Sequence, residues 1–292
     1  MLYLLFSCTI STGLIYFVKG RVYHDKIKVF YDTASKVAKG DFNVRVPISF
    51  DKPKSEMDYL ALNFNKMLVE ISSLENMRNN FIADVSHEIK TPLSVIQGYA
   101  DLLQNQDLSE EKRIEYVYCI SETINTLSEL VTNILKLNKI ENQGIIHKER
   151  FSLDEQLRYC VLSFEEKIEE KNLKINIELE EMYIKNDKTL LEIVWNNLLS
   201  NAIKYTQHGG TISVKLKKEK GKCIVRIFDD GCGMSSETIE HCFDKFYQGD
   251  SSHSQEGNGL GLALVKQVIN LVEGEIKVKS FLGEGTEFIV II

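Results

Sequence analysis

The residues best suited to carry chemistry lie close together in residues 81–93, FIADVSHEIKTPL. His87 offers a nitrogen lone pair near neutral pH, and Glu88 beside it can take up a proton. Thr91 follows four residues after His87, so on a helix both side chains lie on one face. Pro92 removes a backbone donor and is expected to loosen the helix just beyond the histidine. These residue types favour nucleophilic chemistry on His87; the alternative is an amphipathic helix with one solvated histidine.

A second polar group recurs at helical spacing in residues 195–205, where Asn197, Asn201, Lys204 and Tyr205 form a stripe beside leucine and isoleucine. A neutral amide oxygen suits a hard cation such as Mg²⁺, which keeps several waters and shares phosphate oxygens. Lys204 can oppose phosphate charge. The alternative is a solvated helix face, which we disfavour because asparagine is a poor helix former.

A carboxylate and two glycines follow a predicted strand, as Asp229, Gly231 and Gly233. A carboxylate at a strand end can accept a hydrogen bond from the exocyclic amine of adenine. The glycines allow the backbone to come close to the base. This pattern alone is weak, since a tight turn would explain it equally well.

A glycine-rich segment, residues 257–262, opens a predicted helix with Gly257, Gly259, Leu260 and Gly261. Glycine amides at a helix N-terminus can bind phosphate oxygens. The segment lacks the Lys-Ser/Thr of a Walker A loop, and no strand leads directly into it as in a Rossmann fingerprint. An aromatic cluster at residues 242–247 and the polar residues 248–258 precede it, which predicts a mobile lid; satellite packing is the alternative.

The composition of the 292-residue chain is that of a folded protein, with 43% hydrophobic and 26% charged residues. Its length allows two or three domains. The formal charge of −7 argues against a general nucleic-acid binder, because no basic domain is present to neutralise phosphates. The six cysteines show no CxxC spacing, which predicts reduced thiols and not a disulfide framework or a zinc site.

Residues 2–18 carry no charge, and Lys19 and Arg21 follow them. This length is at the short end of what crosses a bilayer, and the following cations predict that the rest of the chain is cytoplasmic. We therefore expect a transmembrane helix over residues 1–19; a buried core helix is the alternative. Residues 20–74 resemble a HAMP relay module, with two helices and an extended connector; a plain juxtamembrane linker is the alternative.

The apolar residues from Leu60 onward recur in alternating steps of four and three, as in the seam of a coiled coil. Around His87 the steps are consecutive fours, so the phase of the repeat changes there. A second seam lies in a helix predicted over residues 110–141. One such hairpin has too narrow a core, so we expect a homodimer in which residues 75–143 of two copies form a four-helix bundle.

Residues 144–292 change to a mixed pattern of helices and strands. Strands are predicted near residues 148–151, 174–179, 182–185, 211–217, 223–228, 275–280 and 287–292. Helices are predicted to start at Ser152 and behind Asp187, and another over residues 260–272. The fold class is therefore multidomain, ending in an α/β sandwich with one sheet and helices on one face.

In this order, FxxDVSHEIKTPL, NNLLSNAIKYT, DDGCGM, FDKFY and GNGLGL resemble the H, N, G1, F and G2 boxes of bacterial sensor histidine kinases. Five motifs in register are far more specific than any one of them. The resemblance covers roughly residues 60–292. It implies a HisKA-type dimerisation hairpin and a GHKL-type ATP-binding domain in residues 144–292.

The resemblance implies roles at the matching positions. His87 would attack the γ-phosphate of ATP, Glu88 would take up the proton, and Thr91 would orient water to dephosphorylate a partner. Asn201 would bind Mg²⁺. The residues that it assigns to nucleotide binding are Asn197, Lys204, Tyr205, Asp229, Gly231, Gly233, Gly257, Gly259, Leu260 and Gly261.

We therefore predict a membrane-anchored, homodimeric histidine kinase that uses ATP and Mg²⁺. It passes phosphate to an aspartate of a response regulator, and a membrane protein is a candidate source of its signal. Three residues depart from the family pattern: Asp230 replaces a common asparagine, and Lys245 and Gln248 stand where arginine is common. The competing functions are a gyrase- or chaperone-type ATPase, which the heptad hairpin disfavours, and a non-catalytic nucleotide-binding scaffold.

Overall fold

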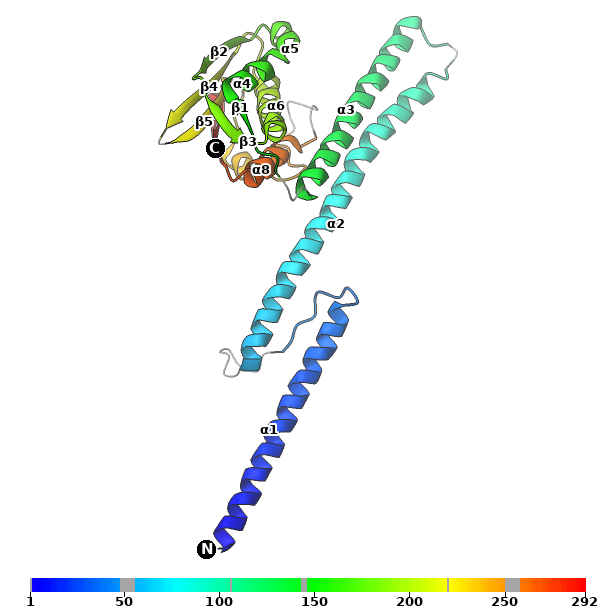
Figure 1. The fold of residues 1–292 in the computed structure, drawn as a ribbon. Helices are drawn as coiled ribbons and strands as arrows, with labels where there is room; N and C mark the ends of the chain where they lie inside the picture. The colour runs from blue at the N-terminus through cyan, green and yellow to red at the C-terminus, as the bar shows by residue number, and fades with distance from the viewer. Residues whose placement is uncertain (1, 48–55, 106, 143–145, 220, 250–257) are drawn as a thin grey trace. The chain divides into compact units, whose positions relative to one another are not determined.

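The computed structural model of the chain describes residues 2–47, 56–105, 107–142, 146–219, 221–249 and 258–292. It has two compact units, residues 1–85 and 86–292, and the boundary between them lies inside a long helix. Figure 1 labels the elements, which in chain order are α1 (Leu2–Val37), α2 (Glu56–Leu102), α3 (Glu110–Asn142), β1 (Glu149–Ser152), α4 (Leu153–Leu162), α5 (Glu165–Glu170), β2 (Lys174–Leu179), β3 (Tyr183–Asn186), α6 (Lys188–Tyr205), β4 (Thr211–Glu219), β5 (Lys222–Asp229), α7 (Ser236–His241), α8 (Gly261–Leu271), β6 (Glu275–Phe281) and β7 (Gly285–Ile291).

The first unit joins α1 to the start of α2 by polar contacts that span the connector. The Lys26 ammonium lies 3.0 Å from the buried Asp58 carboxylate. The side-chain amide of Asn65 accepts from the N–H of Val46 (2.9 Å) and donates to its carbonyl (2.8 Å). This pairing satisfies both backbone groups of Val46, as a neighbouring strand would, and holds Val46 against α2. The predicted second helix begins at Glu56, and residues 48–55 of the predicted connector lie outside the described residues.

The predicted membrane span falls within α1, which is one continuous helix. Among the helices that the structure describes, none has a stretch long and apolar enough to cross a membrane. The transmembrane helix over residues 1–19 therefore stays a prediction.

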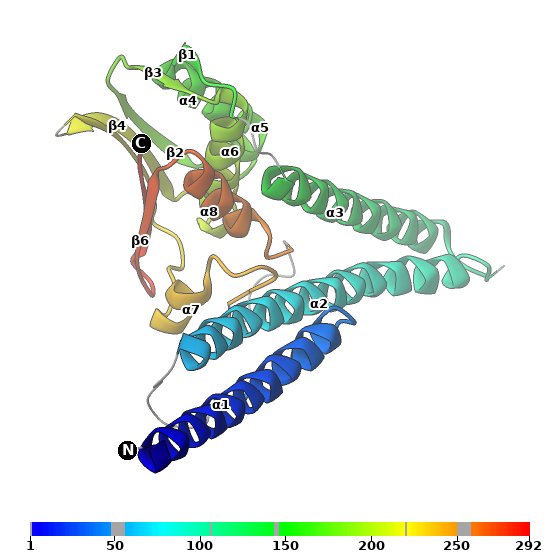
Figure 2. The ribbon, with the colours of Figure 1, turned by 60° about the horizontal axis from the view of Figure 1, so that its bottom comes forward.

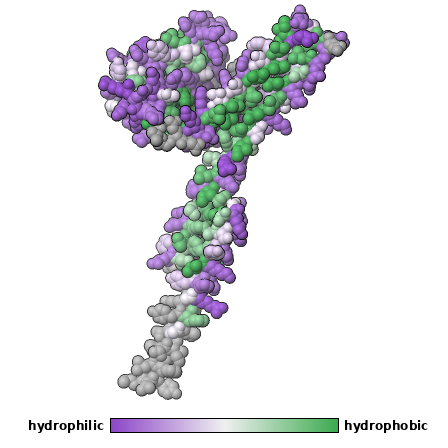
Figure 3. Space-filling view, turned by 45° about the vertical axis from the view of Figure 1, so that its right-hand side comes forward, coloured by the Kyte–Doolittle hydropathy of each residue, from purple (hydrophilic) through white to green (hydrophobic). Residues whose placement is uncertain are grey.

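α3 and the part of α2 from residue 86 onward form the hairpin of the second unit. α2 continues through Pro92, so the proline does not end the helix. Large hydrophobic side chains remain exposed along both helices, among them Leu93, Ile114 and Ile124. Figure 3 shows this band of hydrophobic residues along the hairpin. A single copy thus leaves part of its seam in contact with water.

A five-stranded sheet of order β2-β4-β5-β7-β6 is the centre of the α/β domain. β2 pairs with β4 in parallel, and the remaining neighbours are antiparallel. A separate antiparallel pair, β1 and β3, lies outside this sheet. Both ribbon views place α4, α6 and α8 on one face of the sheet, as predicted (Figures 1 and 2). The short helices α5 and α7 were not predicted.

The core of this domain lies between the sheet and its helices. α6 packs on α4, α8 and β5, and α8 packs on β6. The indole of Trp195 is fully buried and donates to Gln156 Oε1 (3.1 Å), whose amide nitrogen donates to the Lys188 carbonyl (2.7 Å). Burying a tryptophan is favourable only when its N–H finds such a partner. The helix α6, which carries the predicted polar stripe, is thus fixed in the core by its opposite face.

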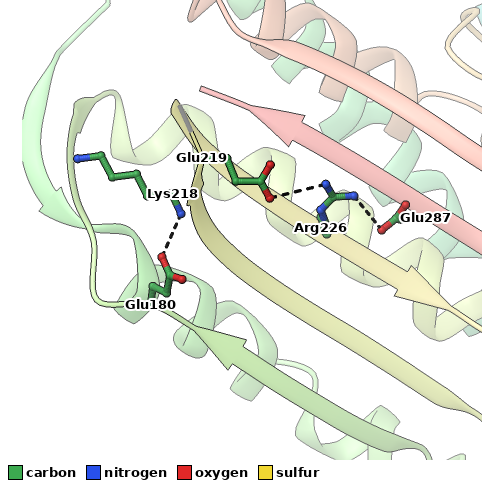
Figure 4. A network of polar contacts seen from close by, with 5 residues as sticks. All are labelled: Glu180, Lys218, Glu219, Arg226 and Glu287. Atoms are coloured by element: carbon green, nitrogen blue, oxygen red, sulfur yellow. Dashed lines mark hydrogen bonds and ion pairs between the residues drawn. The ribbon is translucent and has the colours of Figure 1, made fainter. Parts of the chain in front are cut away.

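The other face of the sheet carries charged side chains in cross-strand pairs (Figure 4). Arg226 lies 3.4 Å from Glu287 and 4.0 Å from Glu219. At the end of β4, the backbone N–H of Lys218 donates to Glu180 Oε2 (3.0 Å). Opposite charges on neighbouring strands stabilise the register of a half-exposed sheet face. This face is the solvated side of the α/β sandwich.

Candidate functional site

The first candidate group lies on α2. His87 and Thr91 are exposed and Glu88 is half-buried. The Thr91 hydroxyl donates to the His87 carbonyl (3.3 Å), which places Thr91 one turn above the histidine as the spacing predicted. Because Pro92 has no N–H, the carbonyl of Glu88 lacks its usual helical donor. The backbone next to the reactive residues is therefore less constrained than in a regular helix, although the helix continues.

The second group lies on α6, and both ends of this helix are fixed. At its start, Asp187 Oδ1 accepts from the N–H of Leu190 (3.1 Å) and Oδ2 accepts from the N–H of His147 (3.1 Å). At its end, the Lys171 ammonium donates to the carbonyls of Ile203 (2.9 Å), Lys204 (2.9 Å) and Thr206 (3.3 Å). A cation at a helix C-terminus satisfies orphan carbonyls and opposes the helix dipole.

The polar stripe of α6 keeps oxygen acceptors available. Asn197 and Asn201 are half-buried and lie one turn apart. The amide nitrogen of Asn197 donates to the Ile193 carbonyl (2.7 Å), which leaves its oxygen as an acceptor. The Lys204 ammonium lies 4.7 Å from the centre of the Tyr205 ring and 3.2 Å from its hydroxyl. The stripe thus presents amide oxygens and one cation on the same helix.

The third group is the turn that follows β5. Asp229 is buried, and the N–H of Gly231 donates to its Oδ1 (3.1 Å). Burial raises the pKa of Asp229 to about 6; the Gly231 and Thr286 N–H groups lower it in part, and the Asp230 carboxylate raises it. Gly233 has a φ of +68°, and a Cβ there would lie 1.9 Å from the Phe281 carbonyl. No other residue type fits this turn without moving the strand beside it.

Asp230, which departs from the family pattern, has a structural partner. Its Oδ1 accepts from the N–H of Thr211 at the start of β4 (2.8 Å), and its side chain is exposed. An asparagine could make the same hydrogen bond without the charge. The charge of the Asp230 carboxylate raises the pKa of Asp229 through space.

The fourth group joins the aromatic cluster to the glycine segment. The N–H of Phe246 donates to the Gly259 carbonyl (3.0 Å), and Leu260 is fully buried. A Cβ on Gly261 would lie 2.8 Å from Asn197 Oδ1, so the start of α8 closely approaches the polar stripe of α6. Gly257 and most of the predicted lid, residues 250–257, lie outside the described residues.

Lys245 of the aromatic cluster has a partner on the hairpin. Its ammonium lies 2.6 Å from Glu141 near the end of α3, and both side chains are partly exposed. α3 also contacts α8, and Leu137 and Ile140 near its end are buried. Lys245, which stands where arginine is common in the family, therefore joins the α/β domain to the hairpin.

Sequence reasoning missed two buried hydroxyls near Asp229. Thr286 on β7 is paired with Asp229 on one side and with Ser280 of β6 on the other. A signal was available, because Ser280 follows Ile276 and Val278 at alternate positions where the strand pattern predicts an apolar residue. The pairing across strands, however, cannot be read from local sequence.

The structure thus brings the α6 stripe, the Asp229 turn and the start of α8 together in one region of the α/β domain. Gly261 approaches Asn197, and a Cβ on Gly231 would lie 2.5 Å from the Tyr205 carbonyl. His87, Glu88 and Thr91 form a group of their own on α2. Within the described residues, no group of three or more His, Cys, Asp and Glu side chains could hold a metal ion.

Two family models match the chain. Residues 77–143 match HisKA, the His Kinase A (phospho-acceptor) domain. Residues 186–292 match HATPase_c, described as histidine kinase-, DNA gyrase B-, and HSP90-like ATPase. The first match covers the hairpin that bears His87, and the second covers α6, the Asp229 turn and α8.

Full-length relatives give the same result. The chain is similar to sensor histidine kinase YclK of Bacillus subtilis (strain 168), with 32% identity over 306 residues, 99% of this chain and 63% of the relative. It is 36% identical over 240 residues to heme sensor protein HssS of Staphylococcus saprophyticus subsp. saprophyticus, 81% of this chain and 51% of the relative. The chain thus spans about half to two-thirds of these relatives.

A solved structure shares the arrangement of elements. The crystal structure of histidine kinase ThkA in complex with response regulator protein TrrA matches 76% of this chain and 63% of that chain. The TM-score is 0.64 and the identity is 25%.

Proposed function

Because this chain belongs to the sensor histidine kinases of two-component systems, we propose that it phosphorylates His87 with ATP and passes the phosphoryl group to an aspartate of a response regulator. One observation carries the proposal. The same chain holds an exposed histidine next to a carboxylate on a helical hairpin, and a buried carboxylate at the glycine turn of an ATPase-like domain.

The α/β domain would bind ATP through the three groups that its fold brings together. Ionised Asp229 would accept a hydrogen bond from the exocyclic amine of adenine, and Gly231 and Gly233 would allow the base to approach. Asn197, Lys204 and Tyr205 would contact the phosphates and the nucleotide. The amides of Gly259 and Gly261 at the start of α8 would face phosphate oxygens, since α8 has no side-chain cap there. The N–H of Leu260 already donates to Asn258 Oδ1 (3.2 Å), and Leu260 is assigned to the same segment. Gly257 is assigned to the same segment.

Mg²⁺ fits the donors present. Asn201 offers a neutral amide oxygen on a half-buried helix face, one turn after the acceptor oxygen of Asn197. Mg²⁺ typically keeps several waters and takes few protein ligands when phosphates share it. We assign Asn201 as the ligand. The ion would neutralise charge on the β- and γ-phosphates while Lys204 opposes the remaining charge.

The chemistry at His87 is a phosphoryl transfer. One ring nitrogen attacks the γ-phosphorus, a P–N bond forms, and the bond to the ADP oxygen breaks. Glu88 accepts the proton from the other ring nitrogen, so the ring does not keep a positive charge when the P–N bond forms. In the second step the phosphoryl group moves to the aspartate of the response regulator. Thr91, one turn from His87, would orient water for hydrolysis of that aspartyl phosphate.

The partners proposed are a second copy of the chain and a response regulator. The exposed hydrophobic band of α2 and α3 supports the homodimer, because two hairpins would bury it in a four-helix bundle. Residues 75–143 would form this dimerisation and phosphotransfer domain, residues 144–292 the ATP-binding domain, and residues 20–74 a HAMP-like relay.

We also propose that residues 1–19 anchor the chain in the cell membrane with the catalytic part in the cytoplasm. The uncharged residues 2–18 and the cations Lys19 and Arg21 support this. A membrane protein that supplies the signal belongs to the same proposal. In cell fractionation, the full chain is expected in the membrane fraction and a chain lacking residues 1–18 in the soluble fraction. Full-length chain in the soluble fraction would contradict the anchor.

Radiolabelled ATP tests the proposed kinase activity. The purified chain with Mg²⁺ should gain a label from the γ-phosphate that is labile in acid and stable in base. His87→Ala should remove the label, while His24→Ala, which changes another exposed histidine on α1, should keep it. Retention of the label in His87→Ala would refute the assignment. Asn201→Ala should lower labelling by at least about a hundredfold, since an electrostatic contact to the transferred phosphate is lost.

A further inference from the structure

Lys171 lies between α5 and β2 and attaches to the end of α6 at two points. Its half-buried ammonium donates to the carbonyls of Ile203 (2.9 Å), Lys204 (2.9 Å) and Thr206 (3.3 Å). Its backbone carbonyl accepts from the N–H of Gly209 (2.9 Å). An ammonium has three hydrogens, so three carbonyls use its full donor capacity. One residue thus holds both the last turn of α6 and the loop that follows it.

The last turn of α6 lies against the turn that carries Asp229. A Cβ on Gly231 would lie 2.5 Å from the carbonyl oxygen of Tyr205 and 2.8 Å from its carbonyl carbon, so Gly231 packs directly on the Tyr205 peptide. The N–H of Gly231 donates to Asp229 Oδ1 (3.1 Å). Tyr205 itself stands between two of the residues whose carbonyls Lys171 holds. The place of the α6 end therefore sets the place of the N–H that orients the carboxylate.

The loop after α6 meets the same turn at a second place. The N–H of Thr211 donates to Asp230 Oδ1 (2.8 Å), and the N–H of Asp230 donates to the Thr211 carbonyl (3.2 Å). A Cβ on Gly210 would lie 2.5 Å from Thr206 Cγ2 and 2.6 Å from Asp230 Oδ1. The end of α6, the loop and the Asp229 turn are thus packed without room for a side chain between them. A displacement of the α6 end would disturb the Asp229 turn through both contacts.

We infer that Lys171 is a positioning residue of the nucleotide site: it holds the end of α6 where the Tyr205 peptide and Gly231 orient Asp229 toward the base. The inference rests on the proposed function, because it assumes that Asp229 contacts adenine. Lys171 acts through these residues and does not touch the nucleotide. It lies outside the sequence motifs that predicted the site, and only the fold brings it to the end of α6.

Equilibrium dialysis of ATP and of adenosine against the full chain tests the inference. Lys171→Met keeps an apolar stem and removes all three donors. If the last turn of α6 then occupies its binding position in about one molecule in ten, the apparent Kd should rise about tenfold, because only that fraction can bind. ATP and adenosine should lose the same factor, since both carry the base. A loss for ATP alone would place the effect at the phosphates and overturn the inference.

The kinetics of labelling separate positioning from chemistry. The ATP concentration that gives the half-maximal rate of His87 labelling should rise about tenfold in Lys171→Met, as the Kd does. The rate at saturating ATP should stay near that of wild type, because bound ATP selects the molecules whose turn is in place. A lower maximal rate with unchanged half-saturation would contradict the assigned role.

Lys215→Met is the matched control. It removes the same charge from an ion pair with Glu178 (2.8 Å) on the solvated face of the sheet and should leave the affinities for ATP and adenosine unchanged. Lys171→Met should also melt at a lower temperature, since three carbonyls lose their donor. A lower melting temperature together with wild-type affinities, measured well below that temperature, would mean that Lys171 only stabilises the fold and would overturn the inference.

The outcomes distinguish the two levels of the proposal. A wild-type chain that does not bind ATP would refute the proposed function itself. A wild-type chain that binds ATP, with unchanged affinities in Lys171→Met, would overturn the role of Lys171 alone. If Lys171→Met does not fold, Lys171→Gln decides, because its amide keeps part of the donor capacity. A Kd raised at least about threefold for both ligands supports the inference, and wild-type values overturn it.

Discussion

The ATP-binding domain and the hairpin bury their apolar residues in different ways. In the domain, Trp195 and Leu198 of α6 and Ile212 of β4 are completely buried within one chain. In the hairpin, one edge of the α3 seam is half-buried, but the other edge is exposed, with Val117 at 53%, Ile124 at 50% and Val131 at 42%. The domain therefore completes its own core, and the hairpin does not.

The exposed edge of the hairpin is the surface that a second copy would cover. Near its end α3 contacts α8 of the ATP-binding domain, and Leu130, Leu137 and Ile140 are buried. Earlier along the helix, the exposed edge recurs every seven residues from Val117, which is the spacing of a coiled-coil seam. One helix thus meets the chain's own domain at one end and has an uncovered edge along the rest.

A charged residue on the exposed edge of α3 should have the largest effect, because it would prevent dimer formation. Val117→Asp would place an unpaired carboxylate in the proposed dimer interface, which costs several kcal/mol. The dissociation constant of the dimer should therefore rise by at least about a hundredfold. Analytical ultracentrifugation would measure it, and labelling of His87 should fall while ATP binding stays unchanged. Asn125→Asp adds the same charge at an exposed position off the seam and should leave the dimer intact. A dimeric Val117→Asp chain would contradict the bundle.

A cavity in the core of the α/β domain should lower the stability of that domain alone. Leu198→Ala removes a fully buried side chain and should lower the free energy of unfolding of the domain by about 2–5 kcal/mol. Leu162→Ala changes an exposed leucine of α4 in the same domain and should cost less than about 0.5 kcal/mol. Urea denaturation followed by Trp195 fluorescence compares them. Equal losses in the two variants would mean that the core is not where the structure puts it.

The pH dependence of ATP binding should report the buried carboxylate of the domain. Burial raises the pKa of Asp229 to about 6, above its value in the unfolded chain, so the folded state holds this proton below about pH 6. Under the proposed role, the ionised form accepts from the adenine amine, so ATP affinity should fall by about tenfold per pH unit below that value. Isothermal titration between pH 5 and 8 measures this.

Asp230→Asn sharpens the same measurement. It keeps the hydrogen bond to Thr211 but removes a charge that raises the pKa of Asp229, so the midpoint should move to lower pH. A midpoint that moves upward, or a pH-independent affinity in the wild type, would show that Asp229 does not control binding.

The smallest effect is expected where the two regions touch. Lys245→Glu replaces the ion pair with Glu141 by a repulsion between partly exposed groups, which is worth about 0.2–1 kcal/mol. The rate of labelling should change by no more than about fivefold. Combining Lys245→Glu with Glu141→Lys should return it toward wild type. No coupling between the two substitutions would mean that the contact plays no part in holding the domain on α3.

Much of this arrangement was predictable from local patterns. Ser152 and Asp187 cap α4 and α6 as expected, because an N-cap depends on residues within one turn. The strands of the sheet also lie close to their predicted ranges. The roles of individual site residues stay predictions, as does the span over residues 1–19.

Local patterns do not predict contacts between residues that lie far apart in the sequence. Only the strand register shows that Thr286 lies beside Asp229 and that Ser280 lies beside Thr286. The contact between Lys245 and Glu141 joins residues 104 positions apart. Asp58, a buried acid in the first unit, forms an ion pair with Lys26 on another helix. Sequence periodicity identifies faces of helices and strands, but it does not say which faces meet.

The Lys171 ammonium at the end of α6 has a consequence for motion. Helix ends usually fray because their last carbonyls lack donors, but here one ammonium donates to three carbonyls. Opening the last turn would have to release all three contacts together, so the backbone amides of residues 202–206 should exchange with solvent as slowly as those in the helix middle. The helix that carries Asn197 and Asn201 would then keep its length and direction whether or not a nucleotide is bound.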